Sequence, residues 1–462
     1  MTARVEELAL RCMLPGFTGT SAPEWIRRRA ARGLGGVVVF ARNFTDREQL
    51  RRLTDSIHAE RPELLVCIDE EGGDVTRLEA QTGSSYPGNL ALGAADDVAL
   101  TEAVAGSIGA ALAACGVDLD LAPVVDVNTN PLNPIIGVRS FGAGAGAVAR
   151  HSAAWVRGLQ GAGVAACAKH FPGHGDTSVD SHLELPVAGE DPRLRALEPF
   201  KAAIGAGVEA IMSAHIVAPT IDELPATISP RVMTGLLRDE LGFTGLAITD
   251  GLEMGGLSTG RGLGESAVLA IAAGCDGLCV GGGLADESVV DELLGAITGA
   301  VESGGLTVER LTEAASRVDA VAEWRAGHEG HGAERPELGL EAARKALRIE
   351  GRVQVGDSVR VVRFDVPDSI AAGEVPWGVE SELAARGARV GDAGTALVLL
   401  VRDLHRHREH RAAVDSWLER RPDAVVVEMG VPICRPHRAR AYIATYGSSR
   451  ASAVAAAEVM RP

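Results

Sequence analysis

The sequence predicts an α/β protein, namely a (β/α)8 TIM-like barrel followed by a smaller α/β sandwich domain. Eight short runs rich in Val, Ile and Leu occur within roughly the first 300 residues, and Ala-rich amphipathic stretches separate them. The same alternation continues to the end of the chain, where the charge balance changes. With 462 residues and 46% apolar content, the chain is long enough to bury two cores.

The eight apolar runs indicate a parallel sheet. None of them alternates between apolar and polar residues, which is typical of strands that are buried on both faces. Eight such strands with helical crossovers predict a closed barrel. The runs lie at about residues 8–14, 36–40, 64–68, 117–125, 164–168, 210–213, 246–249 and 277–280.

The final part of the chain predicts a second domain of a size common for an independent unit. Strands are expected at 359–364, 396–401, 424–427 and 439–445, with a helix at 379–385. Residues 341–462 hold 19 Lys and Arg against 16 Asp and Glu, so the total charge of −17 leaves −20 for residues 1–340. We therefore expect domains at 1–325 and 341–462, joined by a polar, Gly-rich linker at 326–340.

Composition argues against several classes of protein. The acidic larger part lacks the basic footprint that nucleic acid requires. No run of about 18 apolar residues predicts a membrane span, and the first residues do not resemble a signal peptide, so a cytoplasmic location is expected. Most of the seven cysteines lie in or beside apolar runs, which favours reduced and buried thiols: Cys67, Cys115, Cys167, Cys275 and Cys279.

A cluster of His405, His407 and His410 raises the question of a metal site. Arg and Glu residues alternate with these histidines, which favours a solvated loop instead. No zinc spacing such as Cys-x-x-Cys occurs in the sequence. We therefore do not expect a metal site in this segment.

Residues 169–182 form the most informative segment, Lys-His-Phe-Pro-Gly-His-Gly-Asp-Thr-Ser-Val-Asp-Ser-His. The segment is too polar for a core, and Pro172, Gly173 and Gly175 rule out a regular helix. Only three of the 45 Lys and Arg residues are lysines, and Lys169 is one of them. A chain that otherwise uses Arg has reason to keep a compact ammonium here. We expect a functional loop that follows a strand.

Other polar residues follow the predicted strands in the same way. Asp69, Asp126, the Lys169–His170 pair, His215 and Asp250 each come at the end of an apolar run. In a barrel, the loops after the strands build the face that carries the chemistry. These residues are therefore expected to converge at one face.

The segment Lys169–Gly175, followed by Asp180-Ser181-His182, resembles the signature of glycoside hydrolase family 3, and within it the bacterial β-N-acetylglucosaminidases. Residues 68–73, 139–141 and 248–254 match further family motifs in the same order, so the resemblance spans most of residues 1–320. It implies hydrolysis with retention through a covalent glycosyl-enzyme, without a metal or organic cofactor.

The resemblance assigns the catalytic groups. Asp250 matches the nucleophile, although Asp is also a favoured residue at a helix N-cap. His182 matches the proton donor and Asp180 its carboxylate partner, where the alternative is a surface histidine in a mobile loop. The implied substrate contacts are Asp69, Arg77, Arg139, Lys169 and His170. For Arg139, an ion pair that braces the loop after Pro134 is the alternative.

Three positions depart from the family pattern. The family usually has Gln and Arg where this chain has Glu70 and Asp74, and it often has a second acid where Gly251 stands. These changes are expected to alter the hydrogen bonds around Arg77 and beside Asp250.

The expected activity is that of an exo-acting, retaining β-N-acetylglucosaminidase. No tryptophan lies within the matched motifs, so flat stacking surfaces for a long polysaccharide are not expected. Recognition of one terminal N-acetylglucosamine by polar contacts favours small oligosaccharides, such as cell-wall muropeptide fragments or chitin oligomers. The domain after residue 341 is expected to supply neither catalytic group and to act in packing or assembly.

Three alternative functions remain open from the sequence. A glycoside phosphorylase is compatible because a neutral histidine base repels phosphate less than a carboxylate does. A barrel aldolase would use Lys169 as a Schiff base and Gly281–Gly283 to hold a phosphate. A catalytically dead sugar-binding barrel would not require Asp250, His182 and Asp180 together.

Overall fold

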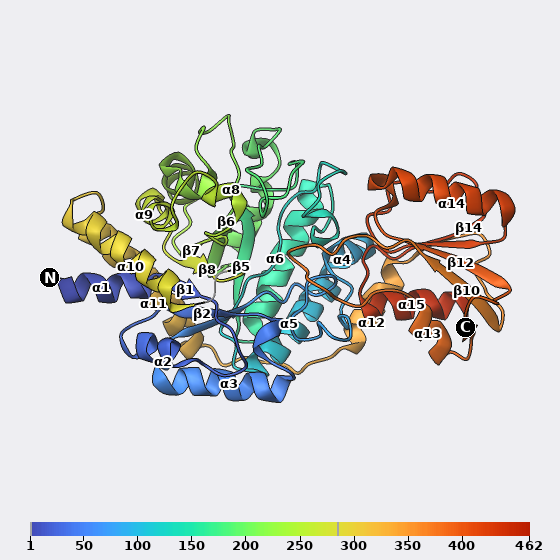
Figure 1. Ribbon diagram of the computed structural model, residues 1–462, viewed down its shortest axis with the longest axis horizontal. Helices are drawn as coiled ribbons and strands as arrows, with labels where there is room; N and C mark the ends of the chain where they lie inside the picture. Colours follow the sequence, from blue (N-terminus) through green and yellow to red (C-terminus); the bar gives the residue numbers. More distant parts are fainter. Residues whose placement is uncertain (1, 284–285) are drawn as a thin grey trace.

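The first part of the fold is built on eight parallel strands. The computed structural model describes residues 2–283 and 286–462, and Figure 1 shows a larger and a smaller lobe. Strands β2 to β7 pair in chain order as one sheet, and β1 pairs with β8. Bridges at Gly16–Val38 and Ile248–Gly277 connect the two sheets. The strands are β1 Met13–Pro15, β2 Gly36–Val39, β3 Leu65–Ile68, β4 Leu119–Asp120, β5 Ala165–Phe171, β6 Ala210–Ser213, β7 Leu246–Thr249 and β8 Leu278–Val280.

Helices surround these strands and bury one face each (Figure 1). In α3, for example, Leu50, Leu53 and Ile57 are buried at helical spacing, whereas Arg51 is exposed. The helices are α1 Thr2–Arg11, α2 Glu24–Ala31, α3 Arg47–Glu60, α4 Asn89–Ala95, α5 Val98–Ala114, α6 Ala145–Gly161, α7 Leu197–Gly205, α8 Gly255–Ser258, α9 Leu263–Ala273, α10 Glu287–Glu302 and α11 Val308–Gly327, with a π-helix at Arg231–Glu240.

The side chains that the strands turn away from these helices form a separate apolar cluster. Helix α11 covers one end of this cluster, because its Val318 lies beside Gly35 at the amino end of β2. Helix α11 therefore does not cover the carboxyl ends of the strands, where the polar site residues lie. The strand residues of the cluster include Leu14, Val38, Leu65, Cys67, Leu119, Ala165, Cys167, Ala210, Met212, Leu246 and Ile248.

The smaller lobe contains a second sheet, in the order β11-β10-β12-β13-β14-β9, in which β9 alone of these strands is antiparallel. Helices α13 and α15 pack on one face and α14 on the other. Helix α12 (Glu337–Ala346) contacts α4 and α5 of the larger lobe as well as α15. The elements are β9 Arg348–Glu350, β10 Ser358–Arg363, α13 Glu380–Ala385, β11 Arg389–Val390, β12 Ala396–Val401, α14 Arg408–Arg420, β13 Val425–Glu428, β14 Ala441–Ala444 and α15 Arg450–Met460.

The predicted α/β class with parallel strands is confirmed, with three corrections to the expected elements. Residues 8–11 belong to α1, which buries Ala9 and Leu10 on one face, so the first strand begins only at Met13. The run 117–125 gives a strand only at Leu119–Asp120, partly because Pro123 has no N–H for a ladder. Strand β5 continues to Phe171, so Lys169 and His170 lie in the strand rather than in the following loop.

The short strands β9 and β11 of the smaller lobe were not predicted. All seven cysteines are free thiols, and five of them are buried. Across the described residues, no helix is long and apolar enough to cross a bilayer, and no three metal-binding side chains are grouped to hold an ion.

The two lobes meet at the loop that follows β3. Asp74 of this loop accepts hydrogen bonds from Arg402 Nη2 at 2.5 Å and from the Ser448 amide and hydroxyl at 2.9 and 2.8 Å. Asp74 and Arg402 are mostly buried, with 5% and 14% of their side chains exposed. The acid that departs from the family pattern at position 74 therefore binds the smaller lobe. The neighbouring His405 also contacts the larger lobe, through the Pro131 carbonyl at 2.6 Å.

We expect Asp74→Ala to destabilise the protein by about 3 kcal/mol, because it leaves the Arg402 guanidinium buried without its partner. The change is measured as a lower urea midpoint of unfolding. Asp74→Ala/Arg402→Met should recover much of the loss, since both charges are then absent. Asp392→Ala, at an exposed position of the smaller lobe, is the control. An Asp74→Ala protein as stable as this control would contradict the assignment.

Candidate active site

A pocket of about 490 Å³ lies at the carboxyl ends of the strands. Seven of the eight predicted site residues line it, and they come from different strands and loops. The structure thus brings together Asp69, Arg77, Arg139, Lys169, His170, His182 and Asp250. Asp180 does not line the pocket and instead contacts His182.

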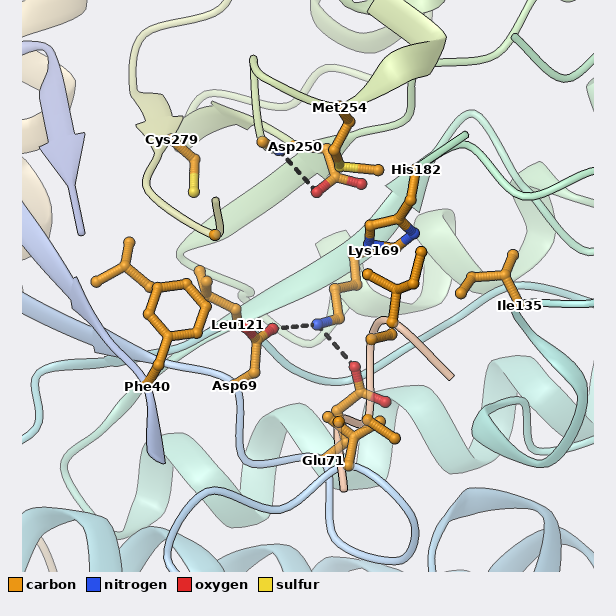
Figure 2. Close-up of a pocket in the computed structure, with 18 of the residues that line it drawn as sticks. Phe40, Asp69, Glu71, Leu121, Ile135, Lys169, His182, Asp250, Met254 and Cys279 are labelled. Atoms are coloured by element: carbon orange, nitrogen blue, oxygen red, sulfur yellow. Dashed lines mark hydrogen bonds and ion pairs between the residues drawn. The ribbon is translucent and has the colours of Figure 1, made fainter. Parts of the chain in front are cut away.

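Four charged side chains form a buried ion cluster on one side of the pocket: Asp69, Glu71, Arg139 and Lys169. Lys169 Nζ lies 2.7 Å from Asp69 Oδ1 and 2.8 Å from Glu71 Oε1 (Figure 2). The Arg139 guanidinium donates two hydrogen bonds to the Glu71 carboxylate, of 2.7 and 2.9 Å. Only 2% of the Lys169 side chain is exposed. The two negative charges are balanced by two positive charges, and this pairing offsets the cost of burying all four groups.

The cluster fixes the charge of its members. Burial favours a neutral Glu71, but Arg139 and Lys169 hold its pKa well below the usual range. Burial likewise disfavours a charged Lys169, but Asp69 and Glu71 raise the pKa of its ammonium. Lys169 is therefore a proton-bearing donor at neutral pH. Asp69 is 19% exposed, so it can offer a carboxylate oxygen to a bound hydroxyl.

His170 is held by a second carboxylate behind it. Its Nδ1 lies 2.8 Å from Asp126 Oδ2, and Asp126 Oδ1 accepts a hydrogen bond from the His174 amide at 2.6 Å. The other ring nitrogen, Nε2, lies 3.5 Å from Arg139 Nη2. Burial would raise the pKa of Asp126, but the interaction with His170 lowers it. The ring of His170 is thereby oriented with Nε2 away from Asp126.

Asp250 lies across the pocket from the buried ion cluster (Figure 2). It follows β7, and its Oδ1 accepts a hydrogen bond from the Gly251 amide at 2.8 Å. Burial alone would raise its pKa, but the neighbouring imidazoles of His170, His215 and His182 and the hydrogen bond from the Gly251 amide lower the pKa of Asp250 to about 2. The carboxylate is therefore ionised at neutral pH, as a nucleophile requires.

His182 forms a close pair with Asp180. Its Nδ1 lies 2.7 Å from Asp180 Oδ1, which also accepts the His182 amide at 2.9 Å. Burial would raise the pKa of Asp180, but the hydrogen bonds with His182 lower it. With 23% of its side chain exposed, His182 remains accessible from the pocket.

The backbone of the His182 segment is fastened to the segment after Asp250. The amides of Gly255 and Gly256 donate to the carbonyls of His182 and Ser181, each at 3.0 Å. A Cβ at position 255 would lie 2.5 Å from the Leu183 carbonyl, so glycine is required for this approach. The two predicted catalytic groups are thus held relative to each other by main-chain contacts.

Two arginines have partners that their predicted roles did not include. Arg139 forms the ion pair considered as its alternative, with Glu71, and donates to the Ile135 carbonyl at 3.1 Å. Arg77 donates to the carbonyls of Ala372 and Ala371 at 3.0 and 2.8 Å. Both arginines still line the pocket.

The other two departures from the family pattern also have a structural account. Glu70 lies beneath the loop, where its Oε2 accepts the Arg77 and Leu78 amides, and burial raises its pKa to about 7. Beside Gly251, the acid two residues on, Glu253, accepts the amides of Gly281 and Gly283 at 2.9 and 3.2 Å.

Three features of the site were not predicted from the sequence. Glu71 joins Lys169 to Arg139, and the only signal was the Asp69-Glu70-Glu71 run after a strand. His174 contacts Thr177 Oγ1 at 2.6 Å and Ser181 Oγ at 3.0 Å, and so braces the His182 segment. Residues 370–374 of the smaller lobe also line the pocket, which no local pattern indicated.

Residues 20–321 match the glycosyl hydrolase family 3 N terminal domain. The chain belongs to glycoside hydrolase family 3. Its smaller lobe lies outside the matched range.

Relatives and solved structures agree with this family. A beta-hexosaminidase from Alkalilimnicola ehrlichii is 42% identical over 255 residues, which cover 53% of this chain and 72% of the relative. One from Bordetella pertussis is 38% identical over 63% of this chain and 84% of the relative. The structure of a family 3 beta-N-acetylglucosaminidase from Paenibacillus sp. str. FPU-7 superimposes with a TM-score of 0.90 at 33% identity, covering 99% of this chain and 96% of that one.

The burial of His174 predicts how the free energy of unfolding depends on pH. Burial lowers the pKa of His174 to about 4, whereas an unfolded histidine titrates near 6.5. Between these values the unfolded chain binds a proton that the folded chain does not. This contribution to stability is therefore complete above about pH 6.5 and falls by roughly 3 kcal/mol as the pH approaches 4.

We expect His174→Gln to flatten the decrease of unfolding free energy between pH 6.5 and 4, measured by urea titration at several pH values. His437→Gln removes an exposed histidine and should leave the slope of the parent protein unchanged. A His174→Gln slope equal to that of the parent would show that His174 is protonated in the folded protein at these pH values.

Proposed function

We propose that this protein is a retaining, exo-acting β-N-acetylglucosaminidase that releases terminal N-acetylglucosamine from small oligosaccharides. The observation that carries this proposal is the pairing, on one pocket, of an ionised Asp250 with the His182–Asp180 pair. The activities after which the related proteins are named, beta-hexosaminidase and beta-N-acetylglucosaminidase, support the choice of sugar. Muropeptide fragments and chitin oligomers both remain candidate substrates.

We infer that β1 to β8 close into a (β/α)8 barrel. The β1–β8 pairing and the bridges Gly16–Val38 and Ile248–Gly277 support closure on both sides of the sheet β2–β7. We propose residues 1–325 as the catalytic barrel, 326–340 as the linker and 341–462 as an α/β sandwich domain. The helices on both faces of its sheet support the last assignment.

In the proposed mechanism, a carboxylate oxygen of Asp250 attacks the anomeric carbon as the bond to the leaving oxygen breaks. The protonated His182 transfers a proton to that oxygen and becomes neutral, and Asp180, bound to Nδ1, orients the ring and stabilises its protonated form before the transfer. The glycosyl–Asp250 ester is then hydrolysed by a water molecule that gives its proton to His182. Both groups return to their initial states.

The buried ion cluster is proposed to hold the terminal sugar. Asp69 accepts hydrogen bonds from hydroxyl groups, and Lys169 donates to hydroxyl oxygens. His170 presents its Nε2 beside Arg139 for the same purpose. Arg77 and Arg139 contribute both by contact and by fixing Asp69 and Glu71.

The geometry argues against a Schiff-base aldolase. Lys169 bears a raised pKa between two carboxylates, so the neutral amine that attacks a carbonyl is scarce. The amides of Gly281 and Gly283, which would have to hold a phosphate, donate to Glu253 instead.

The proposed activity is tested by release of nitrophenol from an aryl β-N-acetylglucosaminide, with and without inorganic phosphate. Free N-acetylglucosamine as the product in both cases is expected. A sugar 1-phosphate formed only with phosphate would assign a phosphorylase. No release with or without phosphate, together with sugar binding, would assign a catalytically dead barrel.

Asp250→Ala should lose nearly all turnover, because the covalent intermediate cannot form. A 5-fluoro glycosyl analogue should add its mass to the peptide that contains Asp250, measured by mass spectrometry after digestion. Asp239→Ala, on the outer π-helix, should keep the activity. Labelling of a different residue would reject Asp250 as the nucleophile.

His182→Ala should affect poor leaving groups much more than good ones. General acid catalysis is typically worth about 10² to 10⁴ in rate, whereas dinitrophenolate departs without protonation. Single-turnover rates across aryl glycosides should therefore depend steeply on leaving-group pKa, and Asp180→Asn should show a weaker trend. Azide should partly restore turnover of the activated substrate. Equal losses for all leaving groups, without azide rescue, would make His182 a binding or folding residue.

A further inference from the structure

We propose that residues 370–374 of the smaller lobe form the leaving-group side of the pocket, and that Glu374 makes it favour uncharged over anionic leaving groups. This inference rests on the proposed function and adds a substrate preference to it. These residues lie between β10 and α13, far in sequence from the family motifs, and outside the matched range of residues 20–321.

The segment is fixed to the larger lobe rather than placed loosely above it. The mostly buried Arg77 guanidinium holds the carbonyls of Ala371 and Ala372. Ala371 also packs against a buried apolar cluster of Val124, Ile135 and Ile136. The segment is thus held by the loops that follow β3 and β4, the same loops that carry Asp69 and Arg139.

The position of these anchors indicates which part of a substrate the segment borders. The buried ion cluster takes the terminal sugar, and His182 must lie at the leaving oxygen. In Figure 2, His182 and Ile135 lie on one side of the pocket, whereas Phe40 and Cys279 lie on the other. Since Ile135 supports the segment, a leaving group that departs past His182 passes residues 370–374.

The segment offers an apolar contact and a negative charge. Ile370 is 56% exposed although it lines the pocket, so a sugar or aryl ring could cover it. Glu374 also lines the pocket and is exposed, and within the described residues it has neither an ion-pair nor a hydrogen-bond partner.

The cations around the pocket are already engaged. Arg77 binds the segment, Arg139 and Lys169 bind Glu71, and Arg42 donates to the carbonyls of Gly281 and Gly282 at 2.5 and 3.1 Å. A carboxylate on the leaving group would therefore lie near Glu374, and the four cations named here are all bound to other groups. Repulsion between like charges disfavours such substrates.

A matched pair of substrates tests the charge preference: the β-N-acetylglucosaminides of 2-nitrophenol and of 4-hydroxy-3-nitrobenzoic acid, which adds one carboxylate. The ratio of kcat/KM for the anionic over the neutral substrate is measured in the parent protein and in Glu374→Gln. We expect the variant to raise this ratio about two- to fivefold, the range for an exposed charge pair. The difference should shrink at high salt, because the charges are then screened.

Glu409→Gln makes the same charge change on α14, away from the pocket, and should leave the ratio unchanged. Ile370→Ala should raise KM for both aryl glycosides but leave inhibition by free N-acetylglucosamine unchanged, since that sugar has no leaving group. Ile433→Ala, 53% exposed in the same lobe, is its control. Thermal melting of each variant verifies folding.

The outcomes separate the two proposals. If the parent protein hydrolyses the neutral glycoside but Glu374→Gln leaves the ratio unchanged, this inference is wrong and the proposed function stands. If Ile370→Ala weakens inhibition by free N-acetylglucosamine, the segment borders the terminal sugar instead. A parent protein that hydrolyses neither glycoside overturns both proposals.

Discussion

The pocket depends on one buried interaction, the ammonium of Lys169 held between Asp69 and Glu71, with Arg139 closing the cluster. Removing these charges from water carries a desolvation penalty, which is offset by the pairing of the charges with one another. The consequence is rigidity: Asp69 and Lys169 cannot move independently, so their hydrogen-bonding groups are placed before a sugar arrives. Across the pocket, Asp250 and His182 are positioned by main-chain bonds between their own segments.

The convergence of the pocket residues could be predicted from the sequence, whereas the contacts between the lobes that surround the pocket could not. Asp69, Lys169 and Asp250 lie near the carboxyl ends of strands, and parallel strands place these ends at one edge. That rule needs only local patterns. His182 lies well past the end of β5, and its role was predicted only through the resemblance to the family motif. The partners of Arg77 could not be predicted, because the carbonyls of Ala371 and Ala372 come from the other lobe and carry no side-chain signal.

The strand errors have a similar origin. Residues 8–11 are apolar enough for a strand, but packing of one face places them in α1.

The smaller lobe was expected to act in packing or assembly, without a catalytic group. It supplies neither of the proposed catalytic residues, yet it reaches the pocket with residues 370–374 and binds the β3 loop through Arg402 and Ser448. Asp74, which departs from the family pattern, is therefore part of the junction between the lobes.

If Asp250 attacks the anomeric carbon and His182 serves both steps, the reaction proceeds by two successive inversions. Proton NMR of the first sugar released from an aryl β-N-acetylglucosaminide tests this most directly. We expect the β-anomer of N-acetylglucosamine to appear first and mutarotation then to form the α-anomer. Initial appearance of the α-anomer would mean a single displacement by water, and would contradict the covalent role of Asp250.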